Sequence, residues 1–543
     1  MMDRIGAATG KKTRRHPPRQ RLLLSIAFAA ALLGFSGCRR PAEATAQAPQ
    51  PNVSSPTPAA QPPPDLASLA SGALAKAAAK SVAVLPFVVR GSGPIGSALA
   101  DGWGEELIAR LGAVPELQTS ARTSSFSFRG KPLRPAEIAR QLGVAHLVEG
   151  ELEWVGDAAR LRVRLIRAET GAEIWRQEAS PGRESWSGAM APLAEAMAQA
   201  LGAETRGATP LAVKPEAYEW YVRGRQAWHQ GTAEGRDRAE EAFNRAVALA
   251  PEFATAHTAL AEVWLVRGQM DDALGFSRSN PAFLPNILAQ LKQAIALEPE
   301  VAWPHALLGD ACAGAWQTEE AKRELETAVR LNPNDATAQL WLAQALATEG
   351  RLEDALEGFR RAAALDPLNP GVIGQQGVAL VLAARSREAL PWLDRALALQ
   401  PTHVQARCWR AWALLELERM PEAIAEAKRL AAAGGAMPAT FAAAVLYRAG
   451  QRKEADEAFR QIPAAVKTSV YYLLAVTGRR DDVIALMAPS IARPEELALL
   501  IYLSAFDSIR SHPRFREILR EAGAGAAHTR GQSERTRWRN AKG

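Results

Sequence analysis

The chain is poor in cysteine, and it lacks the short motifs that most often mark catalysis. Its 543 residues include three cysteines, Cys38, Cys312 and Cys408, and no two of them form a Cys-x-x-Cys pair. The His-Glu-x-x-His zinc motif, the Gly-x-Ser-x-Gly nucleophile motif and a complete Gly-x-x-x-x-Gly-Lys-Ser/Thr phosphate loop are all missing. The sequence therefore predicts no catalytic residues, no metal site and no cofactor, and we expect a protein that is not an enzyme.

The central part of the chain also lacks an excess of positive charge. The formal net charge of +7 is concentrated at the two ends: residues 1–21 carry seven Lys or Arg against one Asp, and residues 530–542 carry five against one Glu. The stretch between them is slightly acidic, so no nucleic-acid partner is predicted. The basic tail, residues 523–543, is interpreted as a solvated disordered end, with contact to acidic lipid or nucleic acid as the alternative.

The first 38 residues have the pattern of an export signal. A basic segment ends at Arg21, and an uncharged apolar run over residues 22–35 follows, which is shorter than the ~20 residues that span a bilayer. Phe35-Ser-Gly-Cys38 resembles the bacterial lipoprotein signal, in which a diacylglycerol is attached to the cysteine. We expect a lipoprotein signal peptide over residues 1–38 and lipidation at Cys38. An uncleaved signal anchor and a soluble secreted form are the alternatives.

All three forms leave the folded chain outside the cytoplasm, because the basic residues stay inside. The predicted location is the cell envelope, as a lipoprotein of the inner or outer membrane that faces the periplasm. Residues 39–80 are rich in Pro and Ala. This composition keeps a chain extended and without a core, so the segment is predicted to be a disordered linker.

Residues 81–203 have the pattern of a small α/β domain, called here the α/β module. A strand-length apolar run covers residues 81–89, helical spacing follows, and three alternating runs lie further on, separated by the turn residues Gly156-Asp157 and Thr170-Gly171. In the middle run Leu161, Val163 and Leu165 alternate with arginines. This alternation predicts one buried face and one wet face, and the runs together predict a mixed sheet.

Several blocks in this module carry a family resemblance. They include Val82-Ala-Val-Leu-Pro-Phe87, Leu147-Val-Glu-Gly150 and Ala168-Glu-Thr-Gly-Ala-Glu-Ile-Trp175. The module resembles the α/β domain related to the TolB amino-terminal domain, which precedes tetratricopeptide repeats in bacterial envelope and regulatory proteins. Some of these relatives carry an adenylate cyclase or winged-helix domain ahead of it. Only the signal and linker precede Ser81 here, so the resemblance implies neither activity.

Four polar residues of the module are the ones to test for chemistry. Asp101 precedes a predicted helix and is interpreted as a cap. Glu105 and Glu106 are adjacent on that helix, so their side chains point apart and cannot act as a facing pair. His146 has apolar neighbours in a predicted strand and is interpreted as a core or edge histidine. None of the four is expected to be catalytic.

Proline recurs with a fixed period in the second half of the chain. Pro299, Pro333, Pro367 and Pro401 stand 34 residues apart, and each closes a phrase such as Arg-Leu-Asn-Pro. This is the period of tetratricopeptide repeats (TPR), and small residues recur where the two helices of such a repeat cross. We expect a superhelix of about seven repeats over residues 214–522, the last ones degenerate. The chain is thus predicted to be α+β, a small α/β domain followed by an all-α solenoid.

A stacked array of this kind leaves a concave groove lined by the first helix of each repeat. The resemblance to tetratricopeptide repeats implies groove positions 2, 5, 9, 12 and 13, counted with the closing proline as position 32. Mixed aromatic and polar side chains there suit capture of a protein or peptide partner, with packing between repeats as the alternative for each Trp. The predicted groove residues are Trp303, Asp310, Leu340, Gln344, Gln405, Trp412 and Glu416.

The sequence thus favours a membrane-anchored envelope scaffold or adaptor that presents a repeat groove and an α/β module. The alternative is a membrane-anchored sensory or regulatory protein whose α/β module binds a ligand.

Cys312 and Cys408 lie on first helices three repeats apart, so about 25 Å is expected between them. A disulfide requires α-carbons within ~7 Å, which disfavours a bond between the two.

Overall fold

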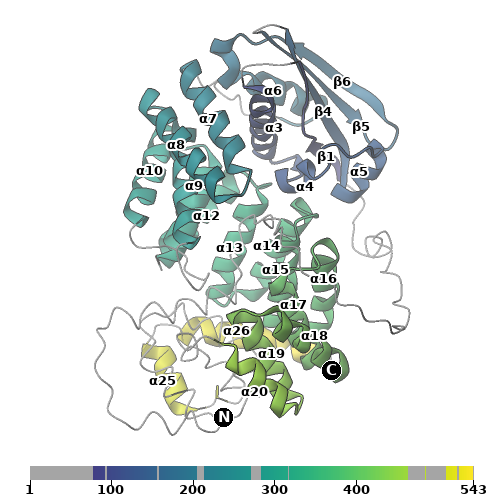
Figure 1. Cartoon of the computed structure of the whole chain (residues 1–543), viewed down its shortest axis with the longest axis vertical. Helices are drawn as coiled ribbons and strands as arrows, with labels where there is room; N and C mark the ends of the chain where they lie inside the picture. Colours follow the sequence, from purple (N-terminus) through teal and green to yellow (C-terminus); the bar gives the residue numbers. More distant parts are fainter. Residues whose placement is uncertain are drawn as a thin grey trace, which may run out of the picture.

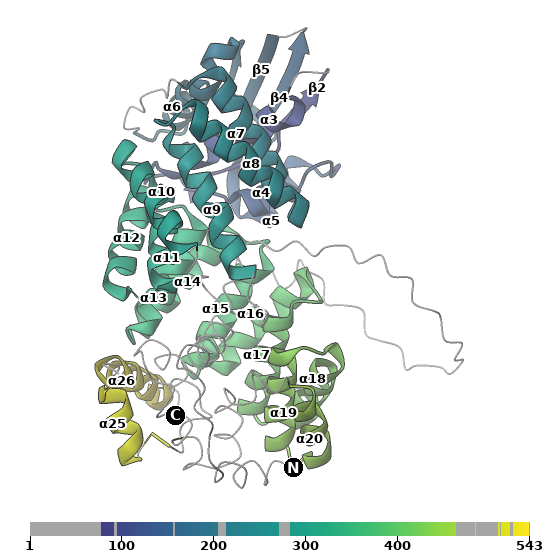
Figure 2. The same ribbon diagram turned by 60° about the vertical axis from the view of Figure 1, so that its left-hand side comes forward.

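The computed structural model describes residues 78–91, 95–155, 158–204, 213–270, 283–315, 317–462, 484, 509–510, 512–521 and 525–541. The predicted signal peptide, Cys38, nearly all of the linker and most of the predicted array after residue 462 lie outside these residues. No helix within the described ranges is both long and apolar enough to cross a membrane. Figures 1 and 2 show the α/β module at one end of the molecule and the helical array extending from it to α20.

The module contains a mixed sheet, as predicted. The strands follow the order β3-β1-β4-β5-β6, and β2 also pairs with β4. β1 runs parallel to β3 and β4, whereas β4, β5 and β6 are antiparallel neighbours. The strands are β1 (Ala78–Val84), β2 (Val88–Arg90), β3 (Gln118–Thr119), β4 (Val144–Val155), β5 (Ala158–Arg167) and β6 (Ala172–Ala179).

The alternation of β5 produces its two faces. Leu161, Val163 and Leu165 are buried in one core cluster with the helices. The arginines between them face glutamates directly across the β4–β5 ladder, so each carboxylate meets a guanidinium, an arrangement that favours this register. The facing pairs are Glu149 with Arg164, Glu151 with Arg162 and Glu153 with Arg160.

Helices cover both faces of the sheet. α3 (Gly96–Gly112) and α6 (Met190–Ala200) contribute to the larger core, and α5 (Pro135–Leu142) contributes to the smaller one on the opposite face. The larger core holds two fully buried tryptophans, and Trp103 Nε1 donates to the carbonyl of Trp186 over 2.9 Å. A short helix, α4 (Arg122–Phe126), follows β3.

Antiparallel helix pairs form the repeat array, the second structural part of the chain. Within the described residues each proline of the 34-residue series follows the second helix of a pair. The pairs are α7 (Pro215–Trp228) with α8 (Ala233–Leu249), α9 (Ala254–Met270) with α10 (Leu284–Leu297), α11 (Ala302–Gly314) with α12 (Thr318–Leu331), α13 (Ala336–Thr348) with α14 (Leu352–Leu365), α15 (Pro370–Leu382) with α16 (Ser386–Leu399), α17 (Val404–Glu416) with α18 (Met420–Ala433), and α19 (Ala436–Arg448) with α20 (Arg452–Arg460).

Gly309 and Gly377 occupy position 8 of their repeats, counted with the closing proline as position 32. Close approach of the two helices of a repeat explains why this residue is small. A Cβ added at Gly309 would lie 2.6 Å from a side-chain carbon of Leu325, and one added at Gly377 would lie 2.6 Å from Leu393. These distances are too short for a real side chain, so the bulky leucine of the second helix requires glycine opposite it. The α+β fold class predicted from the sequence is confirmed.

A polar side chain six residues after the closing proline fixes several inter-repeat loops. In four repeats this side chain bonds to the proline carbonyl, which satisfies a backbone acceptor at the point where the first helix begins. The pairs are His257 with Pro251 (2.8 Å), His305 with Pro299 (3.1 Å), Gln339 with Pro333 (2.9 Å) and Arg407 with Pro401 (2.5 Å). The sequence analysis did not identify this pairing.

The prediction of a disordered tail over residues 523–543 is wrong for most of that segment. Gly525–Ala541 forms helix α26, which follows α25 (Pro513–Glu521). The backbone N–H of Glu353, in the first turn of α14, donates to the Glu534 carboxylate over 3.0 Å, and Arg530 donates to the carbonyl of Glu349 over 3.3 Å. Charged side chains of the tail thus bond to backbone groups at helix ends, which lack intrahelical partners.

Candidate functional site

The concave face of the array is the candidate site, and its predicted residues differ in burial. Asp310, Gln344, Gln405 and Trp412 are buried, whereas Trp303, Leu340 and Glu416 are partly exposed. The indole nitrogen of Trp412 donates to the Glu416 carboxylate over 3.0 Å. Trp412 is therefore a packed side chain in this structure, and the partly exposed residues are the ones placed for contact.

Two tryptophans from successive repeats form one aromatic surface. The rings of Trp303 on α11 and Trp341 on α13 are stacked, with centroids 5.7 Å apart and an interplanar angle of 18°. Both side chains are only partly buried. Trp341 occupies position 6 of its repeat, which the implied groove positions do not include, so sequence reasoning missed it. Its place on the first helix that follows the one with Trp303 was the sequence signal that could have identified it.

Several glutamine amides near this surface lack hydrogen-bond partners. Both polar atoms of Gln344, Oε1 of Gln376 and Nε2 of Gln405 are buried without one in the part of the chain that the structure describes. The three side chains belong to α13, α15 and α17, the successive first helices. An unpaired buried polar group costs about 1–3 kcal/mol. These unpaired atoms therefore lower the stability of the array.

The four polar residues tested in the module all have structural surroundings. Asp101 accepts a hydrogen bond from Arg129 at 2.6 Å, and Glu106 accepts one from Arg110 at 2.8 Å. His146 is buried with Nδ1 3.2 Å from the carbonyl of Ser81, and burial lowers the pKa of its imidazole. Within the described ranges, no three His, Cys, Asp or Glu residues are placed to hold a metal ion.

Glu105 has a different role, because it joins the module to the array. Its carboxylate lies 2.6 Å from Arg122 of α4, 3.0 Å from Arg225 of α7 and 2.5 Å from His229. Burial opposes ionisation, but Arg225, His229 and Arg122 together hold the pKa of Glu105 well below its usual range. Arg225 also contacts Glu262 of α9 at 2.8 Å. Two repeats and the module thus share one buried ionic cluster.

The loops between repeats hold the module at a second place. Asn334 donates to the carbonyls of Gly112 (2.9 Å) and Leu117 (2.5 Å). Asp366 accepts from the backbone N–H (3.1 Å) and the hydroxyl (2.5 Å) of Ser124. Burial raises the pKa of the Asp366 carboxyl even though it accepts these bonds. The loops that carry the 34-residue proline phrases are therefore also the loops that contact the module.

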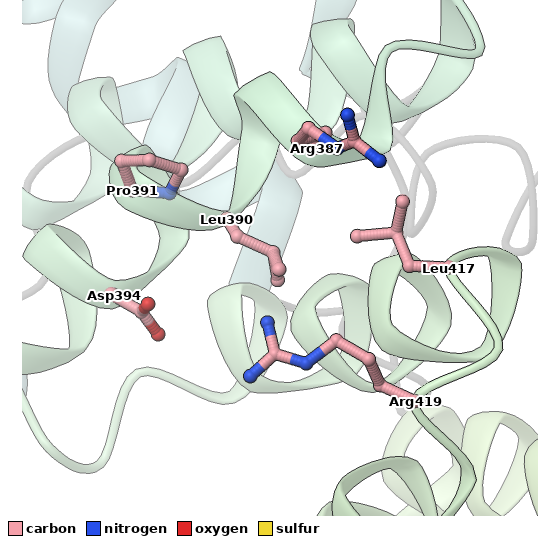
Figure 3. A pocket seen from close by; sticks show the side chains of 6 residues that line it. All are labelled: Arg387, Leu390, Pro391, Asp394, Leu417 and Arg419. Carbon is pink, nitrogen blue, oxygen red and sulfur yellow. The ribbon is translucent and has the colours of Figure 1, made fainter.

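A cavity of about 400 Å³ lies between α16 and the segment that follows α17 (Figure 3). Two of its charged groups already have partners: Asp394 binds Arg410 at 2.6 Å, and Arg419 binds Glu422 at 2.6 Å. Paired charges of this kind favour a structural role over catalysis. The lining residues are Arg387, Leu390, Pro391, Asp394, Leu417 and Arg419.

Comparison with known proteins identifies the repeats. The tetratricopeptide repeat family model matches residues 225–276, 307–370 and 375–438. The curated protein named "Putative adenylate cyclase 3", from Rhizobium meliloti, is 30% identical over 270 residues, which cover 49% of this chain and 44% of that protein. The chain thus spans less than half the length of this relative.

Two solved structures resemble part of the chain. The TPR protein TTC0263 from Thermus thermophilus is 22% identical and covers 37% of this chain and 99% of its own, with a TM-score of 0.31. The Pseudomonas aeruginosa protein pilF is 16% identical and covers 40% of this chain and 90% of its own, with a TM-score of 0.33. The resemblance of the module to the TolB amino-terminal domain stays a prediction. The family match supports tetratricopeptide repeats over these three parts of the helical array.

Proposed function

We propose that this chain is a non-enzymatic, membrane-anchored adaptor of the bacterial envelope, whose repeat groove captures a protein or peptide partner. The observation that carries the proposal is the aromatic and polar surface on the first helices. The stacked Trp303 and Trp341 are partly exposed there, and buried amide atoms without hydrogen-bond partners in the described part of the chain lie on α13, α15 and α17.

The aromatic pair supplies the apolar part of this surface. Partly exposed tryptophans dominate the energetics of many interfaces, because a large rigid ring loses much hydrated area at a small entropic cost. Leu340, the residue before Trp341, is also partly exposed. A partner with an apolar side chain placed against the two rings fits this part of the groove.

The amides supply the polar part. An amide side chain both donates and accepts hydrogen bonds, which matches a peptide backbone. Gln344, Gln376 and Gln405 belong to three successive repeats. Gln344 and Gln405 occupy predicted groove positions, so we assign the groove to an extended or helical peptide segment of another protein.

The anchoring part of the proposal depends on the lipoprotein pattern at Cys38. A lipid at this residue and the Pro-rich linker after it would hold the module and the array at a membrane surface. The test is incorporation of radiolabelled palmitate. The wild-type chain is expected to incorporate label and Cys38→Ala to lose it, whereas persistent labelling of the variant contradicts the anchor.

The groove is tested by recovery of partners with the purified chain. The double variant Trp303→Ala with Trp341→Ala is expected to lose the partners that the wild-type chain recovers from envelope extracts. Trp392→Ala is the matched control, because Trp392 is also partly buried but lies on α16, a second helix. Equal recovery by the double variant and the wild type contradicts the assignment.

A second candidate function is a regulatory protein whose module binds a ligand. The hydroxyls of Thr119, Ser120 and Ser125 are buried without hydrogen-bond partners in the described part of the chain. They lie at and after the carboxyl end of β3, a parallel strand, and such strand ends hold ligands in many α/β sheets. With ATP as the probe, a rise in the melting temperature that is abolished by Ser125→Ala supports this candidate, and no rise argues against it.

A further inference from the structure

One face of helix α3 lies against the first helix of the first repeat. A Cβ added at Gly102 would lie 3.1 Å from a methyl carbon of Val222, so the backbones of α3 and α7 approach closely there. Nearer to the start of α3, the Gln226 amide donates to the hydroxyl of Ser97 over 2.8 Å. Figure 1 shows α7 between α8 and α3. α3 therefore covers the side of α7 that the first helices present to the groove.

The far end of α3 reaches the loop between the third and fourth helix pairs. A Cβ added at Gly112, the last residue of α3, would lie 2.9 Å from the side-chain oxygen of Asn332. Asn334, in the same loop, donates to the carbonyl of Gly112 over 2.9 Å. α3 thus packs on α7 of the first pair and, at its other end, contacts the loop before α13.

Between these two ends the contact is ionic and buried. Glu105 projects from α3 between Arg225 of α7 and His229, which caps the end of α7, at 3.0 Å and 2.5 Å. Arg225 in turn binds Glu262 on the next first helix. The first two repeats thus offer a guanidinium and an imidazole to one carboxylate, and that carboxylate is held by the chain's own helix.

The opposite face of α3 belongs to the module. Leu99, Leu107 and Leu111 are fully buried in the core that also contains Val82 and Val84 of β1. The same core continues into α7 through Ala217, Tyr218 and Val222. α3 therefore makes apolar contacts with both the sheet and the array, and Glu105 adds an ionic contact to the array.

We propose that α3 is a resident ligand of the repeat groove. The surface of α7 is a helix-binding surface that this chain fills itself, and a partner from another molecule binds the remaining surface on α11, α13, α15 and α17. This rests on the proposed function, in which the groove captures a partner. Only a helix with a carboxylate able to replace Glu105 can compete for the filled half.

The test measures the accessibility of a thiol placed at each face of α3, in the full chain. Val222→Cys reports release of α3 from the array, and Val163→Cys reports opening of the sheet core; both valines are buried, at 0% and 1% exposure. Each reporter is combined with Glu105→Gln and, separately, with the control Glu151→Gln, which removes a carboxylate of β4 that also contacts two arginines. Mass spectrometry locates the label.

Glu105→Gln is expected to accelerate labelling at position 222 at least about tenfold and to leave labelling at position 163 unchanged, and Glu151→Gln is expected to change neither. Asn334→Ala, which loosens the other end of α3, provides an independent variant with the same expectation. Equal acceleration at both positions would show a single cooperative core and overturn the proposal, as would no acceleration at position 222. Loss of partner recovery in the Trp303 and Trp341 double variant leaves these labelling rates unchanged, so the two proposals fail separately.

Discussion

Glu105 and Glu106 are neighbours on α3, and the structure predicts different effects on stability when each is changed to Gln. Glu105 meets three cationic or imidazole side chains from α4 and α7. Glu106 contacts Arg110 of its own helix, and burial raises the pKa of its carboxyl. Removing one partner from a buried ionic cluster leaves the other charges uncompensated, which costs about 3 kcal/mol. Removing the Glu106 charge relieves a burial penalty and is expected to be close to neutral.

The assay is thermal unfolding followed by circular dichroism. For domains of this size a change of 1 kcal/mol shifts the melting temperature by about 2–4 °C, so Glu105→Gln is expected to lower it by about 6–12 °C. Because the folded pKa of Glu105 is lowered from 4.5, its stabilisation is present above that pH and is lost as the pH falls through the folded value. The difference in stability between the wild type and Glu105→Gln therefore stays constant from about pH 8 to pH 5 and becomes smaller in stronger acid. Equal melting temperatures for the two variants at neutral pH refute the reasoning.

Two glycines of α15 give a second matched pair. A Cβ at Gly377 would lie 2.6 Å from Leu393, whereas the nearest atom to a Cβ at Gly374 lies at 3.5 Å. In urea unfolding, Gly377→Ala should therefore lower the free energy of unfolding by about 1–3 kcal/mol, and Gly374→Ala should leave it unchanged. Similar losses of stability in the two variants would contradict the packing argument. Burial raises the pKa of the Cys312 thiol to about 12 and also raises that of Cys408, so neither is expected to react with iodoacetamide at pH 8 without denaturant. Rapid labelling of either would show that its helix is not packed as described.

Much of the fold could be predicted because its signals are local and periodic. The 34-residue spacing of the prolines places the helix pairs, since each proline ends a second helix. The alternation of leucine, valine and arginine in residues 160–165 predicts the two faces of β5, since side chains alternate across a strand. These patterns are read from spacings along the chain, so no knowledge of distant contacts is needed to use them.

The joint between the module and the array could not be predicted, because its partners are far apart in the sequence. Glu105 and Arg225 are separated by 120 residues, and Ser124 and Asp366 by 242. No local pattern links such pairs. The tail prediction failed for a related reason: Glu534 is placed at the first turn of α14 by a contact 181 residues away, and charge composition alone suggests a solvated chain.

The central claim is that the groove on α11 and α13 binds a partner, and photocrosslinking from that surface tests it most directly. p-Benzoylphenylalanine replaces Leu340, which is partly exposed beside the two tryptophans, and in a control chain it replaces Arg361, which is exposed on α14, a second helix. After irradiation of intact cells, the account predicts one discrete adduct from position 340 that is absent from position 361. The same adducts from both positions, or none from position 340, would contradict it.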